Sequence, residues 1–282
     1  MIVDTHTHLN FQAFDKDRAE VIKRAEKNKV AMMVVGANFK SSRKAVEIAN
    51  KNSDIFAAIG LHPTHLVEQV FEEDGSKVVS HAEKFEFAAF EQLALNSDVK
   101  AIGECGIDYY HVNPDIPIKD QKNLQKQVMN EHIRLASQQK LPLILHCRDS
   151  KSVSKTAYID LYEIIKNSPH KITGVLHCFS ADWQIAEKFL ELGFYLGFTG
   201  AITYTKSLDI IDVVRRAPKD RILSETDCPY LTPVPFQGKR NEPIYVEYVI
   251  EKIADIRQID YEEAAKITFQ NAKKLFNLEI SI

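Results

Sequence analysis

Eight short apolar segments, each followed by a stretch with helical spacing, constrain the fold of this chain more than any other feature. They begin at residues 2, 30, 55, 99, 141, 172, 194 and 222 and are nearly continuous in apolar side chains. Strands of this composition are typical of a parallel sheet that is covered on both faces by helical crossovers. Eight such units in about 250 residues predict an α/β fold, a (β/α)8 TIM barrel. We expect it to form a single domain over residues 1–282.

An open, doubly wound sheet is the competing architecture. Its Gly-rich phosphate-binding sequence is absent after the first segment, where His6-Thr7-His8 stands instead. The acidic stretch at residues 72–76 is expected to be a solvated loop. Helices are expected at residues 15–28, 41–52, 82–96, 118–140, 152–167, 183–192, 208–217, 243–256 and 261–276.

Composition excludes several classes of protein. The chain is 45% hydrophobic and 27% charged, so it can bury a large core. Its net charge of −3 argues against a protein that coats nucleic acid through a broad basic surface. The first residues lack the basic and apolar regions of a signal peptide, and no apolar run approaches the length of about 18 residues that a membrane helix needs. We therefore expect a cytoplasmic protein that does not bind membranes and is most simply a monomer.

Side chains that bind metals follow five of the eight apolar segments. The carboxyl ends of parallel barrel strands meet at one end of the barrel, so these side chains are expected to converge there. Taken alone, each residue can also be explained without a metal, for example as a hydrogen-bonded core histidine or a turn aspartate. Together, four imidazoles and two carboxylates would leave unpaired polar groups without a cation. The candidate ligands are His6, His8, Glu104, His146, His177 and Asp227.

The six candidates suffice for two divalent cations. We expect one ion to be held by His6, His8, Glu104 and Asp227, and the other by Glu104, His146 and His177. Glu104 would then bridge the two ions with its two oxygens. The ligand types do not select among Mg, Mn and Zn. Such pairs of ions stabilise both the attacking and the leaving oxygen of a phosphoryl displacement.

Each of the four cysteines directly follows a candidate ligand. They contain no C-x-x-C pair, and neighbouring strand residues point to opposite faces. If the ligands face the site, the cysteines face the helices and pack there as small apolar side chains, which we expect rather than a zinc–thiolate site. They are Cys105, Cys147, Cys178 and Cys228.

Further polar residues are expected at the rim of the site. Arg148, two residues after His146, can hold a phosphate in a bidentate manner, and a structural ion pair is the alternative. His62, Asp108 and Asn241 are expected to bind substrate. In the loop after the last strand, Lys239 and Arg240 either steer phosphate or form a solvated basic loop.

These residues resemble the TatD family of metal-dependent deoxyribonucleases, which belong to the amidohydrolase-like TIM barrels. The resemblance implies the same six metal ligands and a divalent-metal-dependent hydrolysis of DNA phosphodiester bonds, with exonuclease action as the expected mode. Ile107 and Ala181 depart from the usual Leu and Gly, and residues 68–80 form a longer acidic segment than usual. The matching stretches are 4–8, 60–63, 103–109, 146–149, 177–180, 225–231 and 240–243.

The expected mechanism uses a metal-activated water. Asp227 is the expected base, Glu104 bridges the ions, and Arg148 holds the non-bridging oxygens of the phosphate. One alternative is an amidohydrolase-like enzyme acting on another ester, an amide, a phosphotriester or acylated tRNA. Related barrels often bridge their metals with a carboxylated lysine, and a glutamate at this position favours the nuclease-like reaction. The other alternative is a non-catalytic metal-binding protein with a closed coordination shell.

Overall fold

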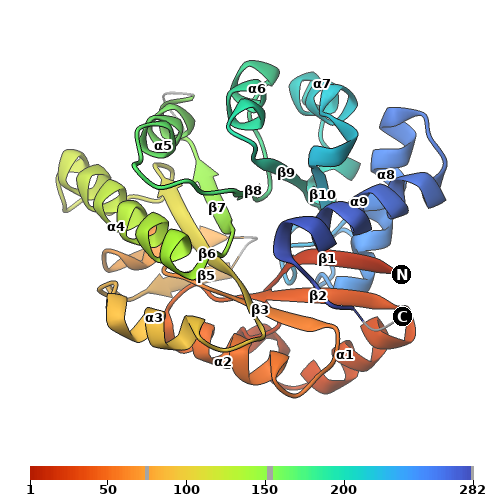
Figure 1. Ribbon diagram of the computed structural model, residues 1–282, viewed down its shortest axis with the longest axis horizontal. Coiled ribbons are helices and arrows are strands. Elements are labelled where there is room, and N and C mark those ends of the chain that lie inside the picture. Colours follow the sequence, from red (N-terminus) through yellow and green to blue (C-terminus); the bar gives the residue numbers. More distant parts are fainter. Residues whose placement is uncertain (74–75, 151–154, 281–282) are drawn as a thin grey trace.

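The structure, a computed structural model, describes residues 1–73, 76–150 and 155–280. Within these ranges a parallel, eight-stranded sheet has the order β1-β2-β3-β6-β7-β8-β9-β10, with helices around it (Figure 1). The strands are β1 (Ile2–Thr7), β2 (Val30–Val35), β3 (Ile55–Ile59), β6 (Val99–Asp108), β7 (Leu143–Arg148), β8 (Gly174–Leu176), β9 (Tyr195–Phe198) and β10 (Ile222–Ser224).

The sheet is nearly closed into a barrel, although β10 and β1 share no regular ladder. The Thr5 hydroxyl donates to the carbonyl of Ser224 at 3.2 Å, and an isolated parallel bridge joins Thr7 to Cys228. These contacts bring the first and last strands together and confirm the predicted (β/α)8 barrel.

The helices lie where helical spacing predicted them, with ends that differ by a few residues. The predicted start of the fifth helix, Ser152, lies outside the described residues. Within those residues, no helix is both long and apolar enough to cross a membrane. The helices are α1 (Arg18–Lys27), α2 (Phe39–Ala49), α3 (Phe87–Ala94), α4 (Ile118–Gln139), α5 (Thr156–Lys166), α6 (Trp183–Glu191), α7 (Leu208–Arg216), α8 (Val246–Arg257) and α9 (Tyr261–Phe276).

The acidic segment after β3 is a hairpin, so the prediction of a loop there is wrong. Strands β4 (Gln69–Glu73) and β5 (Ser76–Ser80) pair in antiparallel register, and residues 74–75 lie outside the described residues. The paired ends of the hairpin, Gln69 and Ser80, are buried, and both donate to the carbonyl of Thr64, at 2.9 and 2.8 Å. These two hydrogen bonds fix the base of the hairpin to the 3-10 helix η2 (Pro63–His65) that follows β3.

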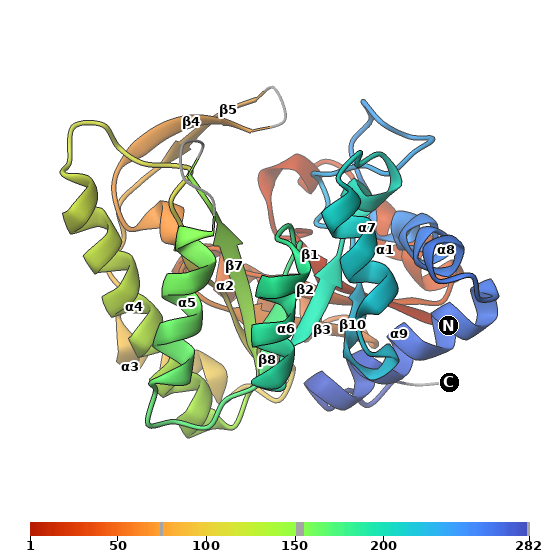
Figure 2. The same cartoon turned by 90° about the horizontal axis from the view of Figure 1, so that it is seen from above.

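One end of the barrel is closed by the C-terminal part of the chain. An apolar cluster inside the barrel includes Val3, Met33 and Ile144, and it continues into Phe276 of α9 and Ile280 beyond it. Figure 2 shows α9 at the end of the barrel opposite the hairpin of β4 and β5. A second, larger cluster lies between the sheet and the surrounding helices. The end with the carboxyl termini of the strands is therefore left for a site.

Strand irregularities turn three predicted ligands toward the barrel axis. Val3 and Ala101 face the barrel interior, so strict alternation would send His6, His8 and Glu104 toward the helices. The register shifts between Asp4 and Thr7 in β1, and between Ile102 and Cys105 in β6. Irregularities of this kind commonly re-aim side chains beside functional sites.

His132 of α4 binds the backbone just after β3. This contact makes the stability of the fold fall in acid. Nε2 of His132 accepts the amide proton of Leu61 at 3.0 Å, and its Nδ1 lies 2.8 Å from the carbonyl of Val128. Only the neutral ring can serve both contacts, and burial lowers the pKa of His132 to about 4. The unfolded chain binds this proton near pH 6.5, so stability is lost as the pH falls from about 6.5 to about 4, by about 3 kcal/mol for this residue.

We therefore expect the free energy of unfolding, measured by urea titration, to fall over this pH range. His132→Gln should reduce that slope. Part of it should remain, because burial also lowers the pKa of His65 to about 4. An unchanged slope in the variant would contradict this role of His132.

Candidate metal centre

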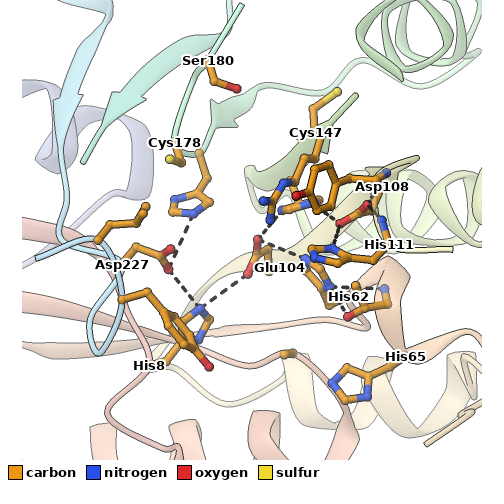
Figure 3. A pocket seen from close by; sticks show the side chains of 18 of the residues that line it. His8, His62, His65, Glu104, Asp108, His111, Cys147, Cys178, Ser180 and Asp227 are labelled. Carbon is orange, nitrogen blue, oxygen red and sulfur yellow. Dashed lines mark hydrogen bonds and ion pairs between the residues drawn. The ribbon is translucent and has the colours of Figure 1, made fainter. Parts of the chain in front are cut away.

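A cavity of about 520 Å3 opens at the carboxyl ends of the barrel strands. Five of the six predicted ligands line it, and the sixth, His6, is fully buried. In Figure 3 the labelled side chains of His8, Glu104 and Asp227 point toward one another. The five lining ligands are His8, Glu104, His146, His177 and Asp227.

The first group of ligands combines the end of β1 with the segment after β10. The Nε2 atoms of His6 and His8 lie 3.2 Å apart. Oδ1 of Asp227 lies 3.3 Å from Nε2 of His8 and 3.7 Å from Nε2 of His6. Two imidazole nitrogens and a carboxylate oxygen at these distances form a donor set that suits a divalent cation.

The backbone beside β1 presents Asp227 to this group. Asp227 has a positive φ of 59°, and its amide donates to the carbonyl of His6 at 2.9 Å. The preceding residue, Thr226, donates its amide and its hydroxyl to the buried carboxyl of Asp4, at 2.9 and 2.6 Å. Burial raises the pKa of Asp4 well above its usual value. Contacts with β1 thus hold this turn in place.

Asn241 holds the same turn through hydrogen bonds within the protein, and the substrate contact expected of it stays a prediction. It is fully buried, and its amide nitrogen donates to the carbonyls of Thr226 at 3.0 Å and Tyr230 at 2.6 Å. Its amide oxygen accepts the amide of Glu242 at 2.9 Å. All of its polar atoms are used within the protein, because the loop after β10 folds back over its side chain.

The neighbouring Arg240 is also engaged within the protein. Its guanidinium donates to both carboxylate oxygens of Asp17, at 2.8 and 2.6 Å. This bidentate pair favours a structural role over the expected steering of phosphate. The expected role of Lys239 stays a prediction.

The second group of ligands comes from β6, β7 and the segment after β3. Nδ1 of His146 lies 3.1 Å from Oε1 of Glu104, and Nε2 of His62 lies 3.5 Å from the same oxygen. These three residues offer ligand atoms that all lie within 4.8 Å of one another. His62, predicted only as a substrate contact, therefore belongs to a potential metal site.

Glu104 lies between the two groups. Its Oε2 is 3.4 Å from Nε2 of His6 and 3.6 Å from Nε2 of His8, while its Oε1 faces the second group. Burial favours the protonated carboxyl, but the surrounding imidazoles outweigh it and lower the pKa of Glu104 well below its usual value. An ionised carboxylate with one oxygen toward each group is what bridging between two cations requires.

His177 lies in a different place from the one predicted. We expected it beside His146, but its ring stacks on that of His6 with centroids 3.5 Å apart. Its Nε2 is 3.7 Å from Oδ1 of Asp227, and its Nδ1 is 2.8 Å from Oε1 of Glu225. Two carboxylates after β10 thus attract it toward the first group. Sequence reasoning missed Glu225, although its position two residues before Asp227 on the same strand extension was a signal.

The imidazoles differ in their pKa values. Burial and the neighbouring His177 lower the pKa of His6, and burial and His146 lower that of His62. Burial also disfavours the charged form of His8 and His177, but nearby carboxylates outweigh it and raise their pKa values. The rings of His6 and His62 are therefore neutral near pH 7, as metal ligands must be.

His146 makes metal binding depend on pH. Burial disfavours its charged form, but its hydrogen bonds to Asp108 and Glu104 outweigh that effect and raise its pKa to about 9. A cation that binds His146 below pH 9 must displace a proton. We expect the apparent affinity for Zn2+ to rise at least about tenfold per pH unit below about pH 9, with proton release.

Titration calorimetry in buffers of different ionisation enthalpy measures the number of protons released. Asp108→Asn should release fewer, because it removes a charge that holds the proton on His146. Zn2+ binding without proton release at pH 7 would contradict this account.

Cys105 and Cys228 pack away from the cavity as predicted, whereas Cys147 and Cys178 border it. Cys105, Cys147 and Cys228 belong to the cluster between the sheet and the helices. Cys178 has a positive φ of 45° and lines the cavity, with Sγ 3.3 Å from the hydroxyl of Thr199. Burial raises the pKa of Cys178 to about 11, so the thiol is protonated at neutral pH.

The two remaining predicted residues, Arg148 and Asp108, have different surroundings at the rim of the cavity. Arg148 lines the cavity, with its guanidinium 4.0 Å from the ring centre of Tyr110. Asp108 is fully buried and accepts from the amides of Tyr110 and His111, as well as contacting His146 and the ring of His111. Its carboxylate therefore organises the wall of the cavity. The substrate contact expected of Arg148 stays a prediction.

Comparison with known protein families bears directly on this centre. The model of a family described as TatD related DNase matches residues 3–277. This chain belongs to the TatD family. The match includes all six predicted ligands of this TatD protein.

Relatives of this TatD protein extend over its full length. YabD of Bacillus subtilis is 39% identical, with 99% of this chain and 100% of YabD covered. YcfH of Escherichia coli K12 is 30% identical, with 99% and 97% covered. Both are named uncharacterized metal-dependent hydrolases. A crystal structure of YJJV, a TatD homologue from Escherichia coli K12, aligns with a TM-score of 0.83 at 27% identity, covering 99% and 98% of the two chains. The comparisons support a metal-dependent hydrolase of the TatD type.

Proposed function

We propose that this TatD protein is a divalent-metal-dependent phosphodiesterase with DNA as its substrate. The observation that carries the proposal is the position of Glu104, whose two oxygens face two separate groups of imidazoles. Two cations on either side of one carboxylate suit the displacement of one phosphate oxygen by another. The family description, TatD related DNase, supports DNA as the source of the phosphodiester.

The ligand sets follow from the distances. His6, His8 and Asp227 with one oxygen of Glu104 would hold the first cation, with His177 beside them. The other oxygen of Glu104 with His62 and His146 would hold the second. When bound, such cations polarise the phosphoryl group and acidify the attacking water.

Asp227 is the group that would accept the proton of the attacking water. Its side chain is 15% exposed in the cavity, compared with 6% for Glu104 and 0% for Glu225. Burial favours its protonated form, but His177 and His8 outweigh that effect and lower the pKa of Asp227 well below its usual value. The carboxylate is therefore ionised at neutral pH and able to accept a proton.

Arg148 would hold the phosphate. Its guanidinium lies over Tyr110, a contact that keeps the side chain oriented at the cavity wall. A planar guanidinium can donate two parallel hydrogen bonds to a phosphate, which suits the non-bridging oxygens.

The lining of the cavity bears on the alternative reactions. It contains no lysine among the described residues, so the bridging position is left to Glu104 rather than to a carboxylated lysine. The open cavity in front of the ligands supports catalysis over a closed, non-catalytic metal site. Hydrolysis of another ester, an amide, a phosphotriester or acylated tRNA is the alternative function.

The test compares substrates under one set of conditions. The protein is stripped of metal and reloaded with Mg2+, Mn2+ or Zn2+. It is then assayed on end-labelled single- and double-stranded DNA, bis(p-nitrophenyl) phosphate, p-nitrophenyl acetate, a phosphotriester and aminoacyl-tRNA. We expect metal-dependent cleavage of the phosphodiesters, with mononucleotides as the DNA product if the enzyme is an exonuclease. Metal-dependent hydrolysis of another substrate without cleavage of DNA or the model phosphodiester would overturn the proposal.

A further inference from the structure

A buried carboxylate, Glu225, lies behind the first group of ligands and has no part in the mechanism above. It is 0% exposed. Its Oε1 accepts the amide of Cys178 at 2.6 Å and lies 2.8 Å from Nδ1 of His177. Its Oε2 lies 3.3 Å from the hydroxyl of Thr5, which shares its single proton between this oxygen and the carbonyl of Ser224. Each oxygen is therefore held in place by contacts from a different part of the barrel.

Glu225 contacts the side of His177 that faces away from Asp227. Nδ1 of His177 lies 2.8 Å from Oε1 of Glu225, although outside hydrogen-bond geometry, whereas Nε2 lies 3.7 Å from Oδ1 of Asp227. A neutral imidazole carries its proton on one nitrogen only. The negative charge of a carboxylate this close to Nδ1 favours the tautomer with the proton there, which leaves the lone pair of Nε2 on the side of the ligand group.

The ring of His6 stacks on that of His177, so its position depends on how His177 is oriented. The two rings lie 3.5 Å apart at 25°. Nδ1 of His6 is buried without a hydrogen-bond partner among the described residues, so no such contact orients that side of its ring. The orientation of His177 therefore fixes the surface against which His6 packs.

Gly197 of β9 makes the room for this carboxylate. A Cβ atom at this position would lie 2.5 Å from Oε2 and 2.7 Å from Oε1 of Glu225. Contacts below 3.0 Å are essentially never seen for a real Cβ, so the carboxylate would have to move. A glycine within a strand often marks such a close approach.

We infer that Glu225 and Gly197 form a buried positioning pair for the metal centre, in which Gly197 provides the space that lets Glu225 orient His177 and, through it, His6. This inference rests on the proposed metal-binding role of the two histidines. Neither residue of the pair touches substrate.

The two positions can be tested against each other. Gly197→Ala adds a methyl group that displaces the carboxylate, and Glu225→Ala removes the carboxylate. The probe is Zn2+ alone, and its affinity is measured by competition with a chelator. Each single variant is expected to bind Zn2+ about 10- to 100-fold more weakly. In the double variant, the added methyl group at position 197 has the space that the carboxylate left, so this variant should bind no more weakly than Glu225→Ala.

Two further measurements separate positioning from loss of structure. Glu225→Gln keeps the acceptor toward His177 but removes the charge, so it should lose less affinity than Glu225→Ala. Nitrogen NMR of the Zn2+-loaded wild type should show the His177 proton on Nδ1, and Gly197→Ala should shift that signal. Thermal unfolding of each variant and an exposed control, Glu163→Gln, reports the stability of the fold.

The inference is overturned if the losses of Gly197→Ala and Glu225→Ala multiply in the double variant, or if Glu225→Ala binds Zn2+ like the wild type. Neither readout involves a substrate. A wild-type protein that binds Zn2+ but leaves DNA intact would contradict the proposed function and leave this inference standing.

Discussion

Glu104→Ala is expected to lower metal-dependent phosphodiester hydrolysis by at least about 1000-fold and to leave fewer than two ions bound per chain. One oxygen of this carboxylate faces His6 and His8, and the other faces His62 and His146. Its removal therefore takes a ligand from both groups at once. Elemental analysis of the dialysed protein measures the metal, and initial rates on bis(p-nitrophenyl) phosphate measure the activity.

Two matched variants sharpen this result. Glu104→Gln keeps the shape of the side chain but removes its charge, and should also lose metal. Glu104→Asp is shorter by one methylene group and cannot reach both groups equally, so it should keep one ion more firmly than the other. Two tightly bound ions in Glu104→Ala would show that this residue does not bridge them.

Asp227→Asn is expected to reduce turnover by about 100- to 10,000-fold, the range typical of a lost general base. An asparagine has nearly the same shape and tolerates the positive φ of this position, so the fold should be unchanged. Its amide cannot accept the proton of the attacking water. Steady-state kinetics should place the loss mainly in kcat, and thermal unfolding should show a melting temperature close to that of the wild type.

Asn241→Asp is a useful companion to this variant. It removes the two donors that hold the Asp227 turn but leaves Asp227 itself. We expect a smaller loss of turnover together with lower stability. Near-normal turnover in Asp227→Asn would mean that another group accepts the proton.

The barrel could be predicted from the sequence because each strand is marked by a continuous run of apolar residues. The expected packing of Cys105 and Cys228 away from the site is also confirmed, whereas Cys147 packs in the same cluster but borders the cavity as well. The hairpin of β4 and β5 was missed because it is held by Gln69 and Ser80, two polar residues that bind the carbonyl of Thr64. Composition does not reveal such a tertiary contact.

The grouping of the ligands could be predicted only in part. Strand order suggested that His177 lies near His146, since β7 and β8 are neighbours. The chain turns after β8, where Cys178 has a positive φ, and Glu225 holds His177 beside His6. His62 takes the place beside His146. Side-chain contacts across the barrel decide these positions, and spacing along the chain does not contain them.

The register shifts in β1 and β6 are a second feature that the sequence did not predict. His6 and Glu104 were predicted at strand ends, but both lie within their strands. They face the site because the register shifts in each strand. The sequence shows which residues are suited to bind metal, and the local backbone decides where they point.

The most direct test of the central claim is a crystal structure of the protein loaded with Mn2+, with the ions located by their anomalous scattering. We expect two Mn2+ peaks in the cavity, with one oxygen of Glu104 on each ion. We also expect His8 and Asp227 on one ion, and His62 and His146 on the other. A single peak, or two peaks that Glu104 does not join, would contradict the two-cation account.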